Sequence, residues 1–187
     1  MSQQELVKTV VEVFNKNHIP YMFTGSFVSS LQGHPRSTHD IDVVVQIFPE
    51  NVEDILMFFS FPDYFVQGEN VQKAIKEKGM FNILDVQGGD KIDCWLLTDS
   101  TFDESRFARK KEQKLFGLNI FVSRPEDTIL AKLYWSKLSG GSEKQFLDAL
   151  RIYEVQYKLL DFHYIRKWVK ELNVEDLWNK ILNTAEV

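Results

Sequence analysis

The chain has two patterns of hydrophobic positions: helical and strand-like segments alternate up to about residue 122, and the pattern is helical from there on. In residues 3–16, apolar side chains at Leu6, Val10 and Phe14 follow the spacing of a helix with one buried face. Runs rich in Val, Ile and aromatic residues then reach strand length at 21–23, 41–48, 80–86, 91–97 and 118–122. Helical patterns separate them at 26–32, 49–59, 70–78 and 102–111, and residues 60–68 fit neither pattern. The interleaving predicts a small mixed β-sheet flanked by helices.

Beyond residue 122 the pattern is helical throughout. After a first helix that ends at Gly140-Gly141, the apolar spacing predicts three more, at about 143–158, 162–172 and 174–184. We therefore expect an α+β fold, with a mixed sheet core over 1–122 and a C-terminal helical bundle over 123–187. The bundle is expected to pack on the core as one compact unit.

Local signals refine the ends of these elements. Ser123 and Glu126 have the spacing of a capping box, and Asp161 and Asn173 are the expected N-caps of the last two helices. The tetrapeptide Gln87–Asp90 favours a hairpin between the runs on either side of it. The second strand of that hairpin can then pair with, or lie next to, the strand at 41–48.

Composition narrows the class of protein. The chain has 187 residues, with 27 acidic and 22 basic side chains and a net charge of −5, so any contact with nucleic acid must come from a local basic patch. The single cysteine, Cys94, excludes a disulfide framework, a disulfide-linked partner and a cysteine-rich metal site. No signal-peptide pattern or membrane-span pattern is present. We expect a soluble cytoplasmic protein with no membrane partner.

The first candidate for chemistry is the pair Asp40 and Asp42 at the head of the Val-rich strand. A spacing of two points both carboxylates to the same face of a sheet. Like charges side by side repel each other unless a cation lies between them. Mg²⁺ takes oxygen ligands of this kind, together with substrate phosphates. The alternative is a pair of solvated carboxylates at a strand end.

A second feature, Gly25-Ser26, joins the strand at 21–23 to a short helix. Glycine permits close backbone approach, and the helix start offers free N–H groups to an anion. The serine either caps the helix or donates its hydroxyl to a phosphate. Arg36, in the loop before Asp40, is within reach of the same phosphates, although arginines in loops are commonly just solvated.

Three further polar residues have both a chemical and an ordinary interpretation. Asp93 adds a third carboxylate, as a ligand or a general base, unless it pairs with Lys91 or faces water. Lys132 lies in an apolar helix and either serves a site or extends to the surface. Asp148 is a site residue, a helix-surface acid or a partner of Lys144.

These residues match a known pattern. The run Thr24-Gly-Ser-Phe, then Arg36-Ser-Thr-His-Asp40-Ile-Asp42, resembles the nucleotidyltransferase superfamily that includes DNA polymerase β. Within that superfamily the chain looks most like minimal bacterial nucleotidyltransferases of the AbiEii abortive-infection toxin type. The similarity continues through Lys91-Ile-Asp93, residues 122–132 and residues 140–148.

The resemblance implies transfer of a nucleoside monophosphate from a nucleoside triphosphate, such as ATP, to an acceptor hydroxyl. Asp40, Asp42 and Asp93 would bind two Mg²⁺ ions, or Mn²⁺ in their place, and Asp93 could be the general base. The triphosphate would be bound by Gly25, Ser26, Arg36 and Lys132. The acceptor would be tRNA or another RNA, a protein or a small molecule, and a toxin role would imply a cognate antitoxin.

Two alternatives remain open on the residues alone. The fold could instead be a catalytically inert module that binds a nucleotide or a protein partner. An RNA acceptor predicts that the basic residues of 106–114 share a face with the three aspartates, whereas a small acceptor predicts an acidic or aromatic pocket there. The helices of 156–187 match no motif, so they do not decide between these acceptors.

Overall fold

The computed structural model describes residues 3–36, 38 and 40–187, and the chain forms two compact units. The first contains the described residues of Met1–Thr24 and Thr38–Val122, and the second those of Gly25–Ser37 and Ser123–Val187. Within this division, residues 25–36 group with the C-terminal helices. Ser37 and His39 of the motif quoted above lie outside the described residues.

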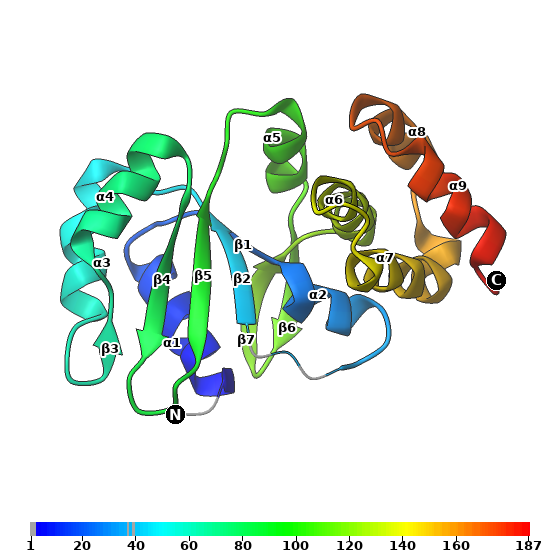
Figure 1. The fold of residues 1–187 in the computed structure, drawn as a ribbon. Helices are drawn as coiled ribbons and strands as arrows, with labels where there is room; N and C mark the ends of the chain where they lie inside the picture. Colours follow the sequence, from blue (N-terminus) through cyan, green and yellow to red (C-terminus); the bar gives the residue numbers. More distant parts are fainter. Residues whose placement is uncertain (1–2, 37, 39) are drawn as a thin grey trace. The chain divides into compact units, whose positions relative to one another are not determined.

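The first unit is built on a seven-stranded mixed sheet, in the order β3-β4-β5-β2-β1-β7-β6 (Figure 1). The strands are β1 Tyr21–Thr24, β2 Asp40–Val45, β3 Tyr64–Phe65, β4 Met80–Asp85, β5 Lys91–Leu96, β6 Lys111–Leu115 and β7 Leu118–Val122. Two neighbouring pairs, β2 with β5 and β1 with β7, are parallel, and the other neighbours are antiparallel. Together with the helices, this confirms the predicted α+β fold with a mixed sheet.

Helices cover this sheet at several places. They are α1 Gln3–Lys16, the 3₁₀ turn η1 Pro49–Asn51, α3 Val52–Phe58, α4 Gly68–Glu77 and α5 Thr101–Ala108. The predicted apolar stripe of α1 is buried, with Leu6, Val10 and Phe14 fully inaccessible. Helices α3 and α4 lie side by side next to β4 (Figure 1). The central strands are buried because their β-branched and aromatic side chains fill the space beneath these helices.

Two details of the sheet differ from the prediction. The ambiguous segment 60–68 contains the two-residue strand β3, and the helix predicted over 102–111 ends at Ala108. Residues Lys111–Leu115 instead form the edge strand β6, which pairs with β7. Its sequence is mostly polar, as expected of an edge strand with little burial, so it carries no hydrophobic period that could reveal it.

The second unit is helical. Its elements are α2 Gly25–Gln32, α6 Pro125–Leu138, α7 Glu143–Gln156, η2 Tyr157–Leu159, α8 Phe162–Glu171 and α9 Glu175–Thr184. Helices α6 and α7 pack along each other, and α2 packs against α7 (Figure 1). The predicted C-terminal helical region is thus present, with α2 added to it.

The predicted helix caps are confirmed at one of three places. The Asp161 carboxylate accepts a hydrogen bond from the Tyr164 backbone N–H, as expected of an N-cap. The capping box at Ser123 is wrong, because α6 begins one residue later and the Ser123 hydroxyl bonds to that of Thr128. Asn173 is also not a cap, since the N-cap of α9 is Val174.

A close contact joins α2 to α7. A Cβ atom added at Gly33, just after α2, would lie 3.1 Å from the backbone nitrogen of Ile152 and 3.2 Å from the carbonyl carbon of Arg151. Distances this short leave no room for a methyl group without movement of the α7 backbone. Gly33 therefore allows the end of α2 to approach α7 more closely than another residue would.

No helix of the described residues is long and apolar enough to cross a membrane.

Candidate active site

In the first unit, a row of polar side chains crosses four adjacent strands at one end of the sheet. Thr24 of β1 is the register partner of Asp42, Asp42 is the partner of Asp93 on β5, and Asp93 is the partner of Asn82 on β4. Partners in a ladder point to the same face. The sheet thus brings together Asp42 and Asp93, which lie 51 residues apart in the sequence. The predicted neighbour relationship of their two strands is confirmed.

Asp40 joins this group through a lysine. Asp40 is the register partner of Lys91, and the Lys91 ammonium lies 3.5 Å from an Asp40 carboxylate oxygen and 3.1 Å from Asp93 Oδ2. Asp93 also accepts a short hydrogen bond from the Asn82 amide. The alternative that Asp93 pairs with Lys91 is therefore correct, and it holds together with the convergence of the aspartates.

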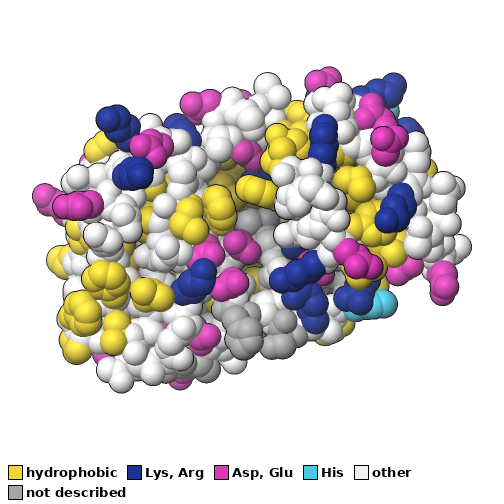
Figure 2. Space-filling view, viewed as in Figure 1, with side chains coloured by type: hydrophobic (Ala, Val, Ile, Leu, Met, Phe, Trp, Pro, Cys, Tyr) yellow, Lys and Arg dark blue, Asp and Glu magenta, His cyan; other side chains and the backbone are white. Residues whose placement is uncertain are grey.

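The pKa of Lys91 reflects the negative charge of the carboxylates around it. Its hydrogen bond to Asp93 and the negative charges of Asp93 and Asp40 raise the pKa of Lys91, against the opposing effect of partial burial. Lys91 is consequently a firmly charged ammonium between two carboxylates. Figure 2 shows the acidic side chains gathered over β2 and β5 with a basic side chain beside them.

Asp42 is oriented by a residue that the sequence does not single out. The indole Nε1–H of Trp95 donates a hydrogen bond of 3.1 Å to Asp42 Oδ1. Trp95 belongs to the next row of the sheet, with Met22 and Val44, and it packs on them and on Phe107 of α5. An apolar row therefore supports the polar row from inside the unit and fixes the position of the indole donor.

The donor set of this cluster suits a hard divalent cation. Carboxylates of neighbouring strands lie at the same end of the sheet, and the ammonium of Lys91 lies between two of them as a cation would. Within residues 3–36, 38 and 40–187, no group of three or more His, Cys, Asp or Glu side chains is arranged to hold a metal ion. Because the Lys91 ammonium lies between Asp40 and Asp93, a metal bound by these two carboxylates would have to take its place.

The second unit holds a different charged cluster, centred on Asp148 of α7. Arg36 binds this carboxylate with two hydrogen bonds, Nε to Oδ1 at 3.1 Å and Nη2 to Oδ2 at 2.8 Å. The Lys132 ammonium on α6 donates to Oδ2 at 2.9 Å. Lys132 is therefore buried in an ion pair and does not extend to the surface, and the partner of Asp148 is not Lys144.

Burial and pairing compete at Asp148. Burial alone would raise the pKa of this carboxyl, but the hydrogen bonds and positive charges of Arg36 and Lys132 outweigh it and hold the pKa below its usual value. The side chains of Asp148 and Lys132 are only 5% and 6% exposed. Removal of one partner from such a pair leaves an uncompensated buried charge. The cluster therefore braces three segments of the second unit.

The start of α2 joins the same cluster. Gly25 has a φ of +66°, a conformation that favours glycine. The hydroxyl of Ser26 accepts from Arg36 Nη2 at 3.0 Å and from the Lys132 ammonium at 3.5 Å. All four residues predicted to bind a triphosphate, Gly25, Ser26, Arg36 and Lys132, thus belong to one group in the second unit, and the Ser26 O–H retains its proton for another acceptor.

The basic residues of 106–114 do not form one patch. Arg106 pairs with Asp103 and is only 13% exposed, and the Lys110 ammonium lies over the ring of Phe107. Lys111 and Lys114 are separated by an odd number of positions on β6, so they point to opposite faces. These four residues therefore do not provide the single basic surface that an RNA acceptor would require.

The chain was compared with protein families, curated proteins and solved structures, and only the solved structures gave matches. No protein-family model matches the sequence, and no curated protein matches it either. Among solved structures, ANT(2'')-Ia in complex with adenylyl-2''-tobramycin is similar, with a TM-score of 0.60 and 12% identity over 94% of this chain and 99% of that chain. The lincosamide antibiotic adenylyltransferase LnuA, bound to lincomycin, has a TM-score of 0.55 and 11% identity over 83% and 98% of the two chains.

A third match is an antigenic nucleotidyltransferase-like protein from Paracoccidioides brasiliensis. Its TM-score is 0.58 at 13% identity, over 98% of this chain and 94% of that one. The chain has the nucleotidyltransferase fold. At these identities the likeness concerns the fold alone, and the special similarity to AbiEii-type toxins that the sequence indicates finds no counterpart among these structures.

Proposed function

We propose that the chain is a Mg²⁺-dependent nucleotidyltransferase that moves a nucleoside monophosphate from a nucleoside triphosphate, such as ATP, to a hydroxyl of an acceptor. The observation that carries the proposal is the polar row of the first unit, in which Asp42 and Asp93 are register partners on adjacent strands. The nucleotidyltransferase fold and the Gly25-Ser26 motif support the same activity.

Asp40, Asp42 and Asp93 are the proposed metal ligands, for two Mg²⁺ ions or for Mn²⁺. When bound, these ions would neutralise charge on the reacting phosphates and favour the ionised form of the acceptor hydroxyl. Trp95 holds Asp42 in one orientation through its indole N–H, and Asn82 does the same for Asp93. Oriented ligands matter because phosphoryl transfer depends mainly on positioning and charge stabilisation.

Asp93 is also the proposed general base. It is the most buried of the three aspartates and already has hydrogen-bond donors from two directions, Asn82 and Lys91. The Asn82 amide fixes the orientation of this carboxylate, and the oxygen that faces Lys91 would accept the proton of the acceptor hydroxyl after the ammonium has moved away.

The triphosphate is the proposed ligand of Gly25, Ser26, Arg36 and Lys132. The positive φ of Gly25 and the first turn of α2 present backbone N–H groups, and the Ser26 hydroxyl adds a donor. Arg36 and Lys132 bring two positive charges to this serine. Part of their charge is balanced by Asp148, so their positions are fixed before a ligand binds.

The acceptor that we propose is a small hydroxylated molecule. ANT(2'')-Ia and LnuA, which have this fold, are structures with adenylyl-tobramycin and lincomycin, and this chain matches nearly their whole length. A small hydroxylated acceptor is consistent with that likeness, and the scattering of the 106–114 cations removes the observation that favoured RNA. An RNA or protein acceptor, with a toxin role and a cognate antitoxin, is the competing form of the proposal.

One observation favours a second function, an inert module that binds a nucleotide or a protein partner. Lys91 already compensates Asp40 and Asp93, so the aspartates do not require a metal to be tolerated. The two functions differ in one measurable property, since only the enzyme incorporates label from an α-³²P nucleoside triphosphate.

The test uses the full chain with each of the four α-³²P nucleoside triphosphates, Mg²⁺ and three acceptor pools: total RNA, total protein and small-molecule extract. Incorporation by wild type, and a loss of about a hundredfold or more in Asp42→Asn/Asp93→Asn, is the expected result. The matched control is Asp63→Asn/Asp90→Asn, which removes the same charge elsewhere in the first unit.

The pool that takes up label identifies the acceptor class. A wild type that transfers no label to any pool, while remaining folded by circular dichroism, would favour the inert module. Equal incorporation by wild type and Asp42→Asn/Asp93→Asn would remove the aspartates from the chemistry.

A further inference from the structure

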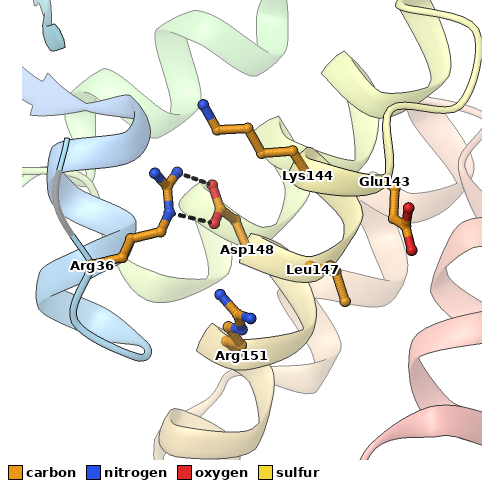
Figure 3. A pocket seen from close by; sticks show the side chains of 6 residues that line it. All are labelled: Arg36, Glu143, Lys144, Leu147, Asp148 and Arg151. Carbon is orange, nitrogen blue, oxygen red and sulfur yellow. Dashed lines mark hydrogen bonds and ion pairs between the residues drawn. The ribbon is translucent and has the colours of Figure 1, made fainter. Parts of the chain in front are cut away.

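Helix α7 lines a cavity of about 420 Å³ in the second unit, and Asp148 forms part of its wall. The volume lies in the range of small-molecule sites. Its lining is mostly charged, as the close-up shows (Figure 3): Arg36, Glu143, Lys144, Leu147, Asp148 and Arg151.

Three of these charged side chains share one face of α7. Lys144, Asp148 and Arg151 are at positions i, i+4 and i+7, which lie above one another on a helix. The helix rises about 10 Å between the first and the last of them. Arg36 binds the middle one, Asp148, from the opposite side of the cavity (Figure 3). The lining therefore presents positive charge at both ends, with the Arg36–Asp148 ion pair between them.

The negative charge in the cavity is largely compensated. Asp148 is neutralised by Arg36 and by Lys132. In contrast, Lys144 and Arg151 make no hydrogen bond or ion pair with any residue that the structure describes. Glu143 is the remaining carboxylate, and Figure 3 shows its side chain directed away from the Arg36–Asp148 pair. Two cations are thus available to a ligand.

This positive cavity is a local feature. The chain as a whole has a net charge of −5, so a general excess of lysine and arginine does not explain it. Figure 2 shows several basic side chains next to one another over α2 and the adjoining part of α7. Guanidinium and ammonium groups in such a group match the oxygens of phosphates.

We propose that the α7 cavity is a binding site for a ligand that bears closely spaced phosphate groups. A single carboxylate could engage only one of the cations, whereas several linked phosphates can contact Lys144, Arg151 and the edge of Arg36 together. Such a ligand is either the tail of a nucleoside triphosphate or the phosphates of a nucleic-acid acceptor. The site itself stands on the cavity, and only its link to a substrate rests on the proposed function.

The test is isothermal titration calorimetry of the full chain at low salt, with EDTA present so that no metal contributes. The probes are inorganic tripolyphosphate, ATP and a short single-stranded RNA. For Lys144→Gln/Arg151→Gln we expect the affinity for tripolyphosphate to fall about tenfold or more, since two charge-assisted contacts are lost. The control Lys158→Gln/Arg166→Gln removes the same charge from exposed positions of the same unit and should bind as wild type does.

The other two probes separate the sources of phosphate. A parallel loss for ATP supports the nucleotide tail, and a loss for RNA with ATP unchanged supports an acceptor. Equal affinities in the two double variants, or no binding of any probe by wild type, would overturn the site. If the double variant does not fold, Lys144→Gln alone, at an exposed position, carries the same test. Absence of label transfer by a wild type that binds tripolyphosphate would instead count against the proposed function.

Discussion

The two charged clusters of the molecule are constructed in opposite ways. In the first unit, carboxylates outnumber the lysine that lies among them, and Asp40 and Lys91 remain 59% and 38% exposed. In the second unit, a single buried carboxylate is held by two cations. The first cluster thus retains negative charge for an incoming cation, whereas the second satisfies its carboxylate and keeps positive charge in reserve. The exposed, net negative cluster of the first unit can therefore bind a cation, whereas the buried, charge-paired cluster of the second unit also stabilises the fold.

The largest expected difference between the clusters is in stability. Asp148→Asn should lower the free energy of unfolding by about 3–5 kcal/mol, because Lys132 and Arg36 would lose a buried counter-charge. Asp40→Asn should change it by less than about 1 kcal/mol, as expected of an exposed pair. Urea denaturation followed by tryptophan fluorescence measures both.

A Trp95→Phe background sharpens this measurement. Trp95 is the tryptophan of the first unit, and Trp135, Trp168 and Trp178 belong to the second, so the remaining fluorescence reports on the helices. A similar midpoint for Asp148→Asn and Asp40→Asn would mean that the buried pair does not brace the second unit.

Acid should affect the second unit through the same carboxyl. The pKa of Asp148 is lower in the folded chain than its ordinary value, so its contribution to stability is complete above about pH 4 and is lost as the pH falls through the folded pKa. In the Trp95→Phe background, urea midpoints between about pH 7 and pH 3 should fall more steeply in the chain that retains Asp148 than in the Asp148→Asn variant. Parallel slopes would contradict this.

The smallest expected effect concerns Lys91. Lys91→Gln removes the ammonium that lies between Asp40 and Asp93, so a divalent cation no longer competes with it. We expect Mn²⁺, titrated into the protein and followed by electron paramagnetic resonance, to bind a few-fold more tightly, since the change amounts to about 1 kcal/mol or less at a partly exposed site. Lys78→Gln, which removes an exposed lysine paired with Asp99, is the control. Weaker binding in Lys91→Gln would show that the lysine assists the metal.

The sequence predicts the first cluster better than the second for a physical reason. Asp40 and Asp42 have the period of a strand, and the hairpin signal places Asp93 on the strand opposite Asn82. Local patterns therefore determine the strands that carry the aspartates, although the parallel pairing that joins Asp93 to Asp42 is tertiary. The pairing of Asp148 with Arg36 and Lys132 joins three segments through tertiary packing, which no periodicity records. An aromatic residue in a strand is usually core, so the sequence gives no reason to select Trp95, and only the register shows its indole beside Asp42.

The elements of the fold also differ in whether local sequence patterns or tertiary contacts determine them. Helix α1 and strands β2, β4 and β5 have strong apolar periods, and their predicted bounds agree with the structure to within three residues. Strand β6 is an edge strand with a polar sequence, and its pairing with β7 rather than its own pattern makes it a strand. The incorrect cap at Ser123 also has a tertiary cause, since this hydroxyl bonds to that of Thr128 instead of a backbone N–H.

The close approach of Gly33 to helix α7 lies near the ion pair between Arg36 and Asp148. Arg36 lies three residues beyond Gly33, and the carboxylate that it binds is on the same helix whose backbone Gly33 touches. A methyl group at Gly33 would require this backbone to shift by a few tenths of an ångström, in the helix that carries the counter-ion of Arg36. An electrostatic arrangement in this protein therefore depends on a position that has no side chain at all.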